Sequence, residues 1–294
     1  MKKLLVLVLF VFITGAFPFV VSADTTCTTK YPVVLSHGMG YTAGGALGIG
    51  YWYNIPSTLT GHGAKVYISD QTAMASTADR AAQLKTYVLQ VLATTGAAKV
   101  NIIGHSQGGL DARYMISNLG MASKVASLTT VCSPNHGSPV ADVILGIDQD
   151  MGGWISGLVS DVYVWLFGGQ QNAAAAAKYV SVSYMNNTFN PGTPNMPGTY
   201  YQSWSSSMYF PCMLDKMVFA VSGALIYYYE GANDGLVSVN SAKWGNYRGN
   251  QSGSFFGSGV SHVNMCDQFL DYTPFFNAKG FYTGVVSDLK GKGY

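Results

Sequence analysis

The sequence predicts an α/β domain in which a mostly parallel central sheet carries helices on both faces. Short apolar runs that suit buried strands alternate along the chain with segments of helical periodicity, which is typical of β–α–β units with parallel strands. One strand-like run, 100–103, leads directly into Gly104-His-Ser-Gln-Gly108 and then into a helix-compatible segment. About 270 residues follow the amino-terminal segment, a length that suits one large α/β domain.

The first half of the chain contains one helix whose two ends can both be placed. Ser76 and Asp79 have the spacing of a capping box at the start of a helix. Apolar residues follow at helical spacing, and Gly96 suits the left-handed residue that ends a helix. The other elements expected here are a strand over 31–36, a helix over 51–59 and a strand over 65–68.

Two more apolar runs extend the predicted sheet into the second half of the chain. Residues 125–131 predict a strand that leads into the proline-bracketed loop 133–139. Residues 218–229 predict at least one further strand. No internal repeat, linker or change of composition marks a second domain, so residues 24–294 are expected to form a single one.

Residues 1–23 have the pattern of an export signal. Two lysines precede an uncharged apolar stretch over 4–21, and the small residues at 21–23 suit a cleavage site. A membrane anchor is the alternative, since the stretch approaches spanning length. Gly15, Pro18 and the cleavage site favour removal of the segment, so the sequence predicts a secreted protein.

Charged residues are scarce and nearly balanced in sign. Lys and Arg number 16 and Asp and Glu 14, the net charge is +2, and charged residues make up 10% of the chain. Without a basic patch or a charge block there is no electrostatic footprint for nucleic-acid binding. A chain that is 48% hydrophobic either exposes apolar surface, which suits contact with an oily phase, or builds a large core.

Ser106 is the leading candidate for a functional residue. In the pattern Gly-x-Ser-x-Gly the serine lies on a sharp strand-to-helix turn, and the glycines leave room for the turn and for a substrate carbonyl. The pattern alone also arises by chance in a glycine-rich chain. Here a strand-like run precedes it and a helix-compatible run follows, so we expect Ser106 to be a catalytic nucleophile.

A serine hydroxyl needs a general base, and the base needs a carboxylate to orient it. After a nucleophile elbow the acid and then the histidine follow the serine along the chain. His136 comes directly after a strand, with no acid-bearing strand between it and the serine, whereas His262 lies in a late loop. His262 is therefore the expected base.

Asp234 is the expected acid. It follows an apolar run and lies between the turn formers Asn233 and Gly235, so a plain Asx turn is the alternative explanation. Its position after a predicted strand, and between the serine and the histidine, favours the catalytic role. The other acidic candidates are Glu230, which ranks second, and then Asp215, Asp267 and Asp271.

Preorganised donors, normally two backbone N–H groups, are needed to bind the oxyanion of a tetrahedral intermediate. Gln107, the residue after the nucleophile, supplies one. The loop after the first strand contains His37, Gly38 and Met39 and is suited to supply the other. We expect the N–H of Met39 to be that donor, with His37 and Gly38 shaping the loop.

Residues 140–178 are predicted to form a helical lid. Apolar side chains recur at helical spacing through the segment, and glycines at 152, 153 and 157 interrupt it where they can act as hinges. The apolar face of such a lid would cover an active site in water and turn outward onto lipid. An ordinary core helix is the alternative interpretation.

These residues together resemble the bacterial triacylglycerol lipases of the Pseudomonas and Burkholderia type. The similarity extends over nearly the whole chain after residue 23 and runs through Tyr31-Pro-Val-Val-Leu-Ser-His-Gly38, Tyr51-Trp-Tyr53, His62-Gly-Ala-Lys-Val-Tyr67, Lys99-Val-Asn-Ile-Ile-Gly-His-Ser-Gln-Gly-Gly109 and Asn233-Asp-Gly-Leu-Val237. The resemblance implies an α/β-hydrolase fold with a mobile helical lid, and a secreted hydrolase of long-chain acylglycerol esters. It supports the triad and the oxyanion donors named above.

The resemblance also implies a structural calcium ion, where this chain departs from the family pattern. In the family, one aspartate before the acid-bearing strand and another two residues after the histidine hold the ion. Here the second position is Asn264, and Asp215 is the nearest residue to the first. Backbone carbonyls near Gln268 and Tyr272 would complete the set. Calcium usually takes more than one carboxylate, so the neutral Asn264 weakens the expected site. No cofactor is expected for the chemistry itself.

The cysteines suggest a substitute for that ion. Exported chains form disulfides; Cys212 lies near the first calcium position and Cys266 follows His262 by four residues. A Cys212–Cys266 disulfide would join the two loops that calcium joins in the relatives. Cys27 and Cys132 lie at opposite edges of a parallel sheet, about 16 Å apart over five residues, and are not expected to pair.

The same residues are compatible with other functions. A soluble-ester esterase or a polyester depolymerase would differ only in lid and pocket, and the fold also hosts peptidases and acyltransferases. A catalytically silent protein that binds lipid is the alternative from another class. The expected partner is an acylglycerol or other lipid ester at an oil–water interface. Some relatives also need a lipase-specific foldase, and a monomer is the expected state.

Overall fold

The computed structural model describes residues 24–40, 43–44, 50–147, 157, 173–209, 214–268 and 275–294. The expected export signal at 1–23 lies outside these ranges, as does most of the expected lid, residues 148–156 and 158–172. In the part of the chain that is described, no helix combines the length and the apolar character needed to cross a membrane.

The described strands form one parallel sheet in the order β2-β1-β3-β4-β5-β6. They are β1 (Val33–Ser36), β2 (Val66–Ile68), β3 (Val100–His105), β4 (Val125–Val131), β5 (Tyr200–Ser206) and β6 (Asn246–Gln251). Every pairing is parallel, which confirms the predicted type of sheet. The carboxyl ends of all these strands therefore meet at one edge.

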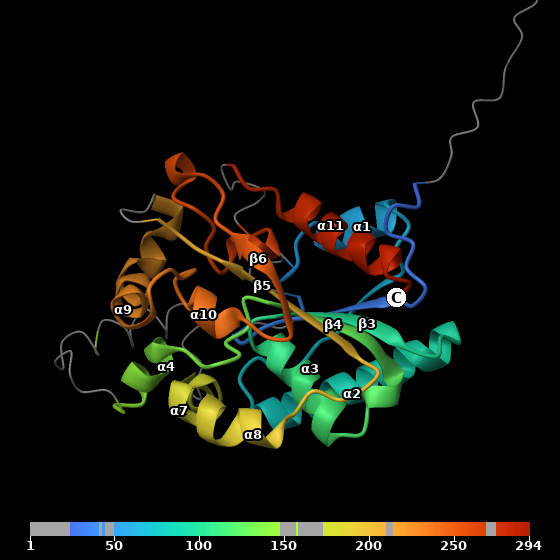
Figure 1. Ribbon diagram of the computed structural model, residues 1–294, viewed down its shortest axis with the longest axis horizontal. Coiled ribbons are helices and arrows are strands. Elements are labelled where there is room, and N and C mark those ends of the chain that lie inside the picture. Colours follow the sequence, from blue (N-terminus) through green and yellow to red (C-terminus); the bar gives the residue numbers. More distant parts are fainter. Residues whose placement is uncertain are drawn as a thin grey trace, which may run out of the picture.

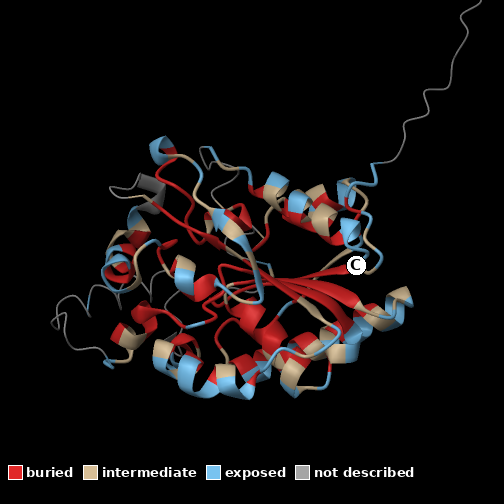
Figure 2. Ribbon diagram, viewed as in Figure 1, coloured by how far each residue is buried: buried red, intermediate tan, exposed pale blue. Residues whose placement is uncertain are grey.

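Helices cover both faces of the sheet (Figure 1). The helices α2 (Thr77–Thr95) and α3 (Gln107–Asn118) lie on one face, and α1 (Ile55–Gly61) and α11 (Ala278–Gly291) lie on the other. One cluster of buried apolar side chains joins β1 to α1 and α11, and another joins β3 and β4 to α2 and α3. Figure 2 shows the central strands buried between these layers.

The predicted ends of α2 are confirmed. Ser76 Oγ accepts a hydrogen bond from the Asp79 N–H at 3.1 Å, and Gly96 ends the helix with a φ of +67°. Both signals depend on local geometry alone: a side-chain oxygen satisfies an N–H at the helix start, and a residue without Cβ takes the left-handed position at its end.

The other helical segments with described bounds are mostly short. They are α4 (Pro139–Ile144), α6 (Ala173–Ala177), α7 (Val182–Tyr184), α8 (Asn190–Gly192), α9 (Ala220–Glu230) and α10 (Val239–Ala242), with the 3₁₀ segments η1 (Ala122–Lys124), η2 (Lys178–Val180), η4 (Leu214–Phe219), η5 (Phe255–Gly257) and η6 (Asn264–Cys266) and the π-helical η3 (Met185–Phe189).

The predicted strand over 218–229 is wrong, because these residues form the end of η4 and most of α9. A short apolar run fits a buried strand and a buried helix equally well. Leu225 and Ile226 pack in the same apolar cluster as α4, whereas Tyr227 and Tyr228 are exposed. Two buried residues followed by two exposed ones fit a helix with one covered face, not a strand.

The strands β5 and β6 have no apolar run that reveals them in the sequence. Buried polar side chains in β5 find partners in the fold: Gln202 Nε2 donates to Thr129 Oγ1 at 2.9 Å, and Ser203 Oγ accepts from the Trp244 N–H at 2.8 Å. The edge strand β6 alternates exposed with half-buried residues. Neither pattern is that of a fully buried parallel strand, which is normally apolar.

The chain leaves the sheet after β5 and returns to it just before Asp234. The N–H of Met208 donates to the carbonyl of Asn233 at 2.8 Å, and Met208 also forms a bridge with Gly259. The segment that contains α9 is therefore an insertion between β5 and the turn at Asp234. The strand that leads to the expected acid is therefore β5, and the turn at Asp234 lies at the carboxyl edge of the sheet.

Candidate active site

Ser106 lies between β3 and α3 with a φ of +55° and a ψ of −131°. A positive φ is uncommon for a residue with a side chain. The Ser106 N–H donates to the Val131 carbonyl at 3.0 Å, and the Ser106 carbonyl accepts from the Gly109 N–H at 3.1 Å. Hydrogen bonds on both sides thus hold the sharp strand-to-helix turn that was expected at this serine.

Both glycines of the motif are required by close backbone contacts. A Cβ atom on Gly104 would lie 2.6 Å from Gly109 Cα, and one on Gly108 would lie 2.2 Å from the Ser36 carbonyl oxygen. Non-bonded carbon and oxygen atoms do not approach so closely. The elbow packs against β1 and the first turn of α3 only because these two positions lack a side chain.

His262 and Asp234 form a buried hydrogen-bonded pair. His262 Nδ1 lies 2.8 Å from Asp234 Oδ2, and the His262 N–H donates to the Asp234 carbonyl at 2.9 Å. The two residues are 5% and 1% exposed. A carboxylate oxygen only accepts, so Nδ1 carries the ring proton and Nε2 is the ring's acceptor.

Asp234 is at once a turn residue and the partner of the histidine. Its Oδ1 accepts from the N–H groups of Leu236 and Val237, at 3.0 and 2.8 Å, while Oδ2 faces His262. The Asx turn that is the alternative explanation for this residue is present, and it is what presents the carboxylate to the ring.

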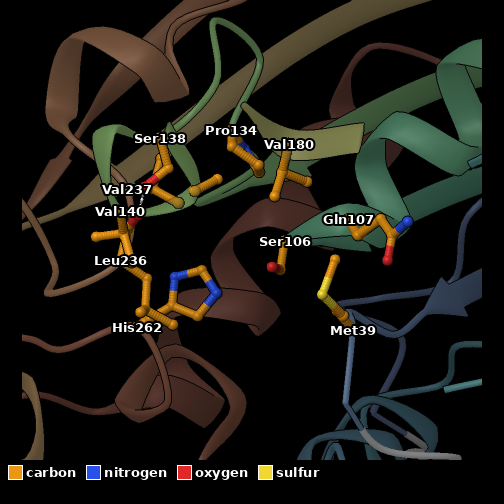
Figure 3. A pocket seen from close by; sticks show the side chains of 11 residues that line it. Met39, Ser106, Gln107, Pro134, Ser138, Val140, Val180, Leu236, Val237 and His262 are labelled. Atoms are coloured by element: carbon orange, nitrogen blue, oxygen red, sulfur yellow. Dashed lines mark hydrogen bonds between the residues drawn. The ribbon is translucent and has the colours of Figure 1, made fainter. Parts of the chain in front are cut away.

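Ser106 and His262 face each other across one pocket (Figure 3). The imidazole turns its Nε2 edge toward the Ser106 hydroxyl. Ser106 comes from the turn after β3, His262 from the loop after β6, and Asp234 from the turn beyond β5. The fold therefore gathers at one edge of the sheet three residues that are far apart in the chain.

The other candidates for base and acid lie elsewhere. His136 is exposed, with its ring 5.8 Å from the ring of Trp244. Glu230 accepts a hydrogen bond from the Ser238 hydroxyl. Neither residue is among those that line the pocket of Ser106.

Apolar side chains form most of the pocket wall. They are Met39, Pro134, Val140, Ala141, Val180, Leu236 and Val237. Val140 and Ala141 belong to α4, and Val180 ends η2. Segments on both sides of the undescribed part of 140–178 thus border the pocket.

Met39 and Gln107 also border the pocket beside Ser106. Gln107 is the first residue of α3, where a backbone N–H has no partner within the helix. A Cβ atom on Gly38 would lie 2.7 Å from Ser106 Cβ and 2.6 Å from the Tyr51 hydroxyl oxygen. The loop after β1 therefore approaches the serine as closely as a backbone without a side chain allows.

Arg80, on α2, holds the loop that carries Met39. Its Nη2 donates to the carbonyls of His37 and Gly38, at 2.7 and 3.2 Å, and its Nε donates to Asp111 Oδ2 at 2.8 Å. The N–H and C=O of a trans peptide point in opposite directions. Because the Gly38 carbonyl faces Arg80, the Met39 N–H of the same peptide points away from Arg80.

The Arg80–Asp111 pair is completely buried. Burial raises the pKa of the Asp111 carboxyl to about 7, although the charge of Arg80 and its hydrogen bond oppose this rise. A buried pair contributes little net stability but is costly to break. No local pattern predicts it, because the partners are 31 positions apart on two helices that meet only in the fold.

His37 is held neutral beside the site. Its Nε2 accepts from the Gln71 N–H at 2.9 Å, so the ring proton is on Nδ1, which donates to the Gly38 carbonyl at 2.8 Å. Burial, and after it the charge of Arg80, lowers the pKa of His37 to about 4. The loop is thus held by a charged donor on one side and a neutral one on the other.

His105, the residue before the serine, supports the main chain of His262. Its Nε2 lies 3.1 Å from the His262 carbonyl oxygen, which only accepts, so Nδ1 accepts from the Tyr51 hydroxyl at 2.7 Å. Burial, and next the charge of His262, lowers the pKa of His105 well below its ordinary value. His105 lies within the Gly-x-Ser-x-Gly motif, but the motif does not predict this role.

Asn264 does not fit the calcium ligand set that the resemblance implies. Its Oδ1 accepts from the N–H and the hydroxyl of Ser261, at 2.9 and 2.8 Å, which uses both lone pairs of the amide oxygen. Tyr272 and the side chain of Asp215 lie outside the described residues. The side chain of Gln268 donates to the carbonyls of residues 50 and 51. Over the described ranges, no group of three or more His, Cys, Asp or Glu side chains could hold a metal ion.

The predicted Cys212–Cys266 disulfide is wrong for this structure, because Cys266 carries a free thiol. Its side chain is buried in the apolar cluster beneath α11, together with Tyr51. Cys212 itself lies outside the described residues. Cys27 and Cys132 are also free, buried thiols.

A family model described as the alpha/beta hydrolase fold matches residues 31–204. A triacylglycerol lipase of Vibrio cholerae is 34% identical over 240 residues, which cover 74% of this chain and 75% of that protein. A triacylglycerol lipase of Burkholderia plantarii is 43% identical over 157 residues, or 52% of this chain. The match spans only 43% of the length of the Burkholderia protein.

Among solved structures, the mature form of a Bacillus licheniformis lipase superposes with a TM-score of 0.65. The superposition covers 88% of this chain and 92% of the lipase, at 18% sequence identity. At this identity the likeness concerns the fold. It agrees with the parallel sheet and the two helical layers described above.

Proposed function

The chain belongs to the α/β hydrolase fold family, together with bacterial triacylglycerol lipases, and from this premise we propose that it hydrolyses carboxylic esters of acylglycerols. Ser106 is the nucleophile, His262 the general base and Asp234 the carboxylate that orients the base. The 2.8 Å contact between His262 Nδ1 and Asp234 Oδ2 carries the proposal, because it leaves Nε2 as the acceptor that faces the serine hydroxyl.

Acylation begins at the Ser106 hydroxyl. His262 Nε2 takes the hydroxyl proton as Oγ attacks the ester carbonyl carbon, and a tetrahedral intermediate forms. The imidazolium then donates that proton to the departing alcohol oxygen, and the acyl group stays on Oγ. Asp234 remains ionised throughout and stabilises the imidazolium.

Deacylation repeats these steps with water. His262 removes a proton from a water molecule as its oxygen attacks the acyl carbon, and Ser106 Oγ leaves with the proton that the imidazolium returns. In both half-reactions the oxyanion is stabilised by the N–H groups of Gln107 and Met39. Each such donor is worth about 10²–10³ in kcat in well-studied serine hydrolases.

The apolar wall of the pocket favours an uncharged, apolar substrate. Side chains such as Val140, Val180 and Leu236 offer contact to an acyl chain. No Asp, Glu, Lys or Arg occurs among the described residues that line this pocket. A charged ester would therefore lose its hydration there without gaining a partner.

Export and a lid are part of the proposal. The apolar stretch at 4–21 with small residues at 21–23 supports secretion. Val140, the first residue of the predicted lid, and Val180, which follows its end, both border the pocket and support a segment that covers it. Turnover of one ester measured through its solubility limit tests the lid: we expect a rise when a separate phase forms. Plain saturation below that limit would favour a soluble-ester esterase.

Ser106→Ala tests the assignment of the nucleophile. The variant should lose ester turnover by several orders of magnitude, since the acyl-enzyme cannot form, while its thermal unfolding stays close to that of the wild type. Ser57→Ala is the matched control, because Ser57 is an exposed residue of α1 whose hydroxyl donates to the Asn54 carbonyl at 2.9 Å. Equal activity in the two variants would contradict the proposal.

A further inference from the structure

The loop that carries His262 is closed by reciprocal hydrogen bonds between Ser261 and Asn264. The Ser261 N–H and hydroxyl donate to Asn264 Oδ1 at 2.9 and 2.8 Å, and the Asn264 N–H donates to Ser261 Oγ at 3.3 Å. Both residues are fully buried. This is the reciprocal i, i+3 pattern of a capping box, with an amide where an acid or a glutamine is usual. It lies in the turn that precedes η6, whose own N-cap residue is Val263, and His262 lies inside the closed ring.

The main chain of His262 is fixed at both of its polar atoms. Its N–H donates to the Asp234 carbonyl at 2.9 Å, and its carbonyl accepts from His105 Nε2 at 3.1 Å. The N–H of Val260 donates to the Ser207 carbonyl at 2.8 Å and anchors the chain just before the loop. The Asn264 side chain closes the turn that these bonds leave open on the carboxyl side of His262.

We propose that Asn264, acting with Ser261, is a positioning residue that holds the His262 imidazole between Asp234 and Ser106 without a bound metal ion. The inference rests on the proposed roles of Ser106 and His262. A small displacement of a catalytic group costs orders of magnitude in rate, so closing this turn matters for turnover as well as for stability.

Charge explains why an amide suits this position. The site needs one acceptor for two donors of Ser261, and an amide oxygen supplies it without a net charge. Among the described residues Asn264 Nδ2 has no hydrogen-bond partner, and it is buried, so a carboxylate in its place would put an unpaired oxygen there. A buried carboxylate without a cation is costly, whereas the neutral side chain needs none.

The amide cannot be turned over to form a different contact. If Nδ2 exchanged places with Oδ1, an N–H₂ group would face the N–H of Ser261, and two donors would oppose each other. The 2.9 Å separation between Ser261 N and the amide therefore fixes Oδ1 toward Ser261. The side chain is committed to the turn and does not offer its oxygen to an ion.

The test compares Asn264→Ala with Asn277→Ala on a soluble short-chain ester. Asn277 is the matched control, because its Oδ1 also closes a turn by accepting from a backbone N–H, that of Gly280 at 2.8 Å, at the start of α11. We expect Asn264→Ala to lower kcat by about 10- to 100-fold with KM little changed, and Asn277→Ala to leave both constants close to wild type. Equal kcat in the two variants would overturn the proposal.

A second variant and a treatment with chelator complete the test. Asn264→Asp retains the acceptor and should recover most of the kcat that Asn264→Ala loses, at the expense of a lower Tm, since a buried charge has been added. Excess EDTA should leave wild-type kcat and Tm unchanged. A loss of kcat that calcium reverses would contradict the proposal that Asn264 positions His262 without a bound metal ion. If Asn264→Ala does not fold, Ser261→Ala removes only the hydroxyl contacts and is compared with the same control.

Failure of the inference can be told apart from failure of the proposed function. If Ser106→Ala retains turnover, the assignment of the nucleophile is wrong and the positioning role falls with it. If Ser106→Ala abolishes turnover while Asn264→Ala is as active as Asn277→Ala, the function stands and only the role of Asn264 is refuted.

Discussion

Two loops flank Ser106, and they are held in place by opposite kinds of chemistry. The loop that carries Met39 is anchored by the buried, charged Arg80 and by the neutral ring of His37. The loop that carries His262 is closed by Ser261 and Asn264, neither of which ionises. Both arrangements fix a backbone segment next to the serine; Asp111 and His37 at the first loop titrate, whereas the contact between Ser261 and Asn264 contains no titrating group.

The difference follows from what each loop offers to its neighbour. The first loop presents two carbonyls, at residues 37 and 38, and a planar guanidinium can donate to both while binding Asp111. The second presents donors from Ser261, which need a single oxygen acceptor. The stability that Asp111 and His37 contribute at the first loop should therefore vary with pH, whereas the stability that the Ser261–Asn264 contact contributes should not.

Among the substitutions that test this difference between the two loops, Arg80→Lys is expected to have the largest effect, a fall in kcat. An ammonium group cannot reach Asp111 and the two loop carbonyls with fixed geometry, so the Met39 N–H loses its orientation. We expect kcat to fall by about 10²-fold, the value of one oxyanion donor, and KM to change much less. Steady-state kinetics on a soluble ester measure this.

The control for Arg80→Lys is Arg248→Lys. Arg248 pairs with Asp288 at 3.3 Å on the surface, with both side chains about a third exposed. Exposed pairs contribute little, so this variant should behave like the wild type. If Arg80→Lys also retains full kcat, the proposed role of the Met39 N–H as an oxyanion donor does not depend on the guanidinium.

Asp111→Asn should show a penalty that depends on pH. Because burial raises the pKa of Asp111 to about 7, the folded state binds a proton that the unfolded state releases near pH 4. The stability from this group is complete below that pH and is lost as pH rises through about 7. The variant lacks this titration, so its loss of unfolding free energy should be larger at pH 5 than at pH 8.

Urea unfolding of wild type and Asp111→Asn at the two pH values checks this sign. Asn264→Ala is the internal comparison, because it removes no titrating group and its penalty should be the same at both values. A penalty for Asp111→Asn that grows toward pH 8 would mean that the paired, ionised form dominates the folded state.

His37→Asn is expected to have the smallest effect and the opposite dependence on pH. Burial lowers the pKa of His37 to about 4, so the stability from the neutral ring is present above about pH 6.5 and is lost as pH falls through 4. The penalty of His37→Asn should therefore shrink from pH 7 to pH 5. The same change at the exposed His136 should cost little at either value.

Sequence patterns predicted the parts of the molecule that depend on neighbouring residues. The ends of α2 at Ser76 and Gly96 follow from local capping geometry, and the turn at Ser106 follows from glycines that leave space for β1 and α3. The turn formers beside Asp234 indicate a turn there, and the structure has one: the Asp234 carboxylate accepts from the N–H groups of Leu236 and Val237.

Parts that depend on distant partners could not be predicted in this way. The polar β5 is buried because Thr129 and Trp244 satisfy its side chains, and the apolar 218–229 run becomes a helix because it packs on α4. Arg80 and Asp111 look like ordinary residues of two amphipathic helices until the fold brings them together. Cys266 lies in the core, which the spacing of cysteines does not reveal.

Reaction of the folded protein with a fluorophosphonate tests most directly whether Ser106 is activated by the His262–Asp234 pair. We predict one covalent adduct, on the peptide that contains Ser106, absent from Ser106→Ala and formed orders of magnitude more slowly in His262→Ala. An unlabelled Ser106 in folded wild-type protein, or labelling of His262→Ala at the wild-type rate, would contradict the account.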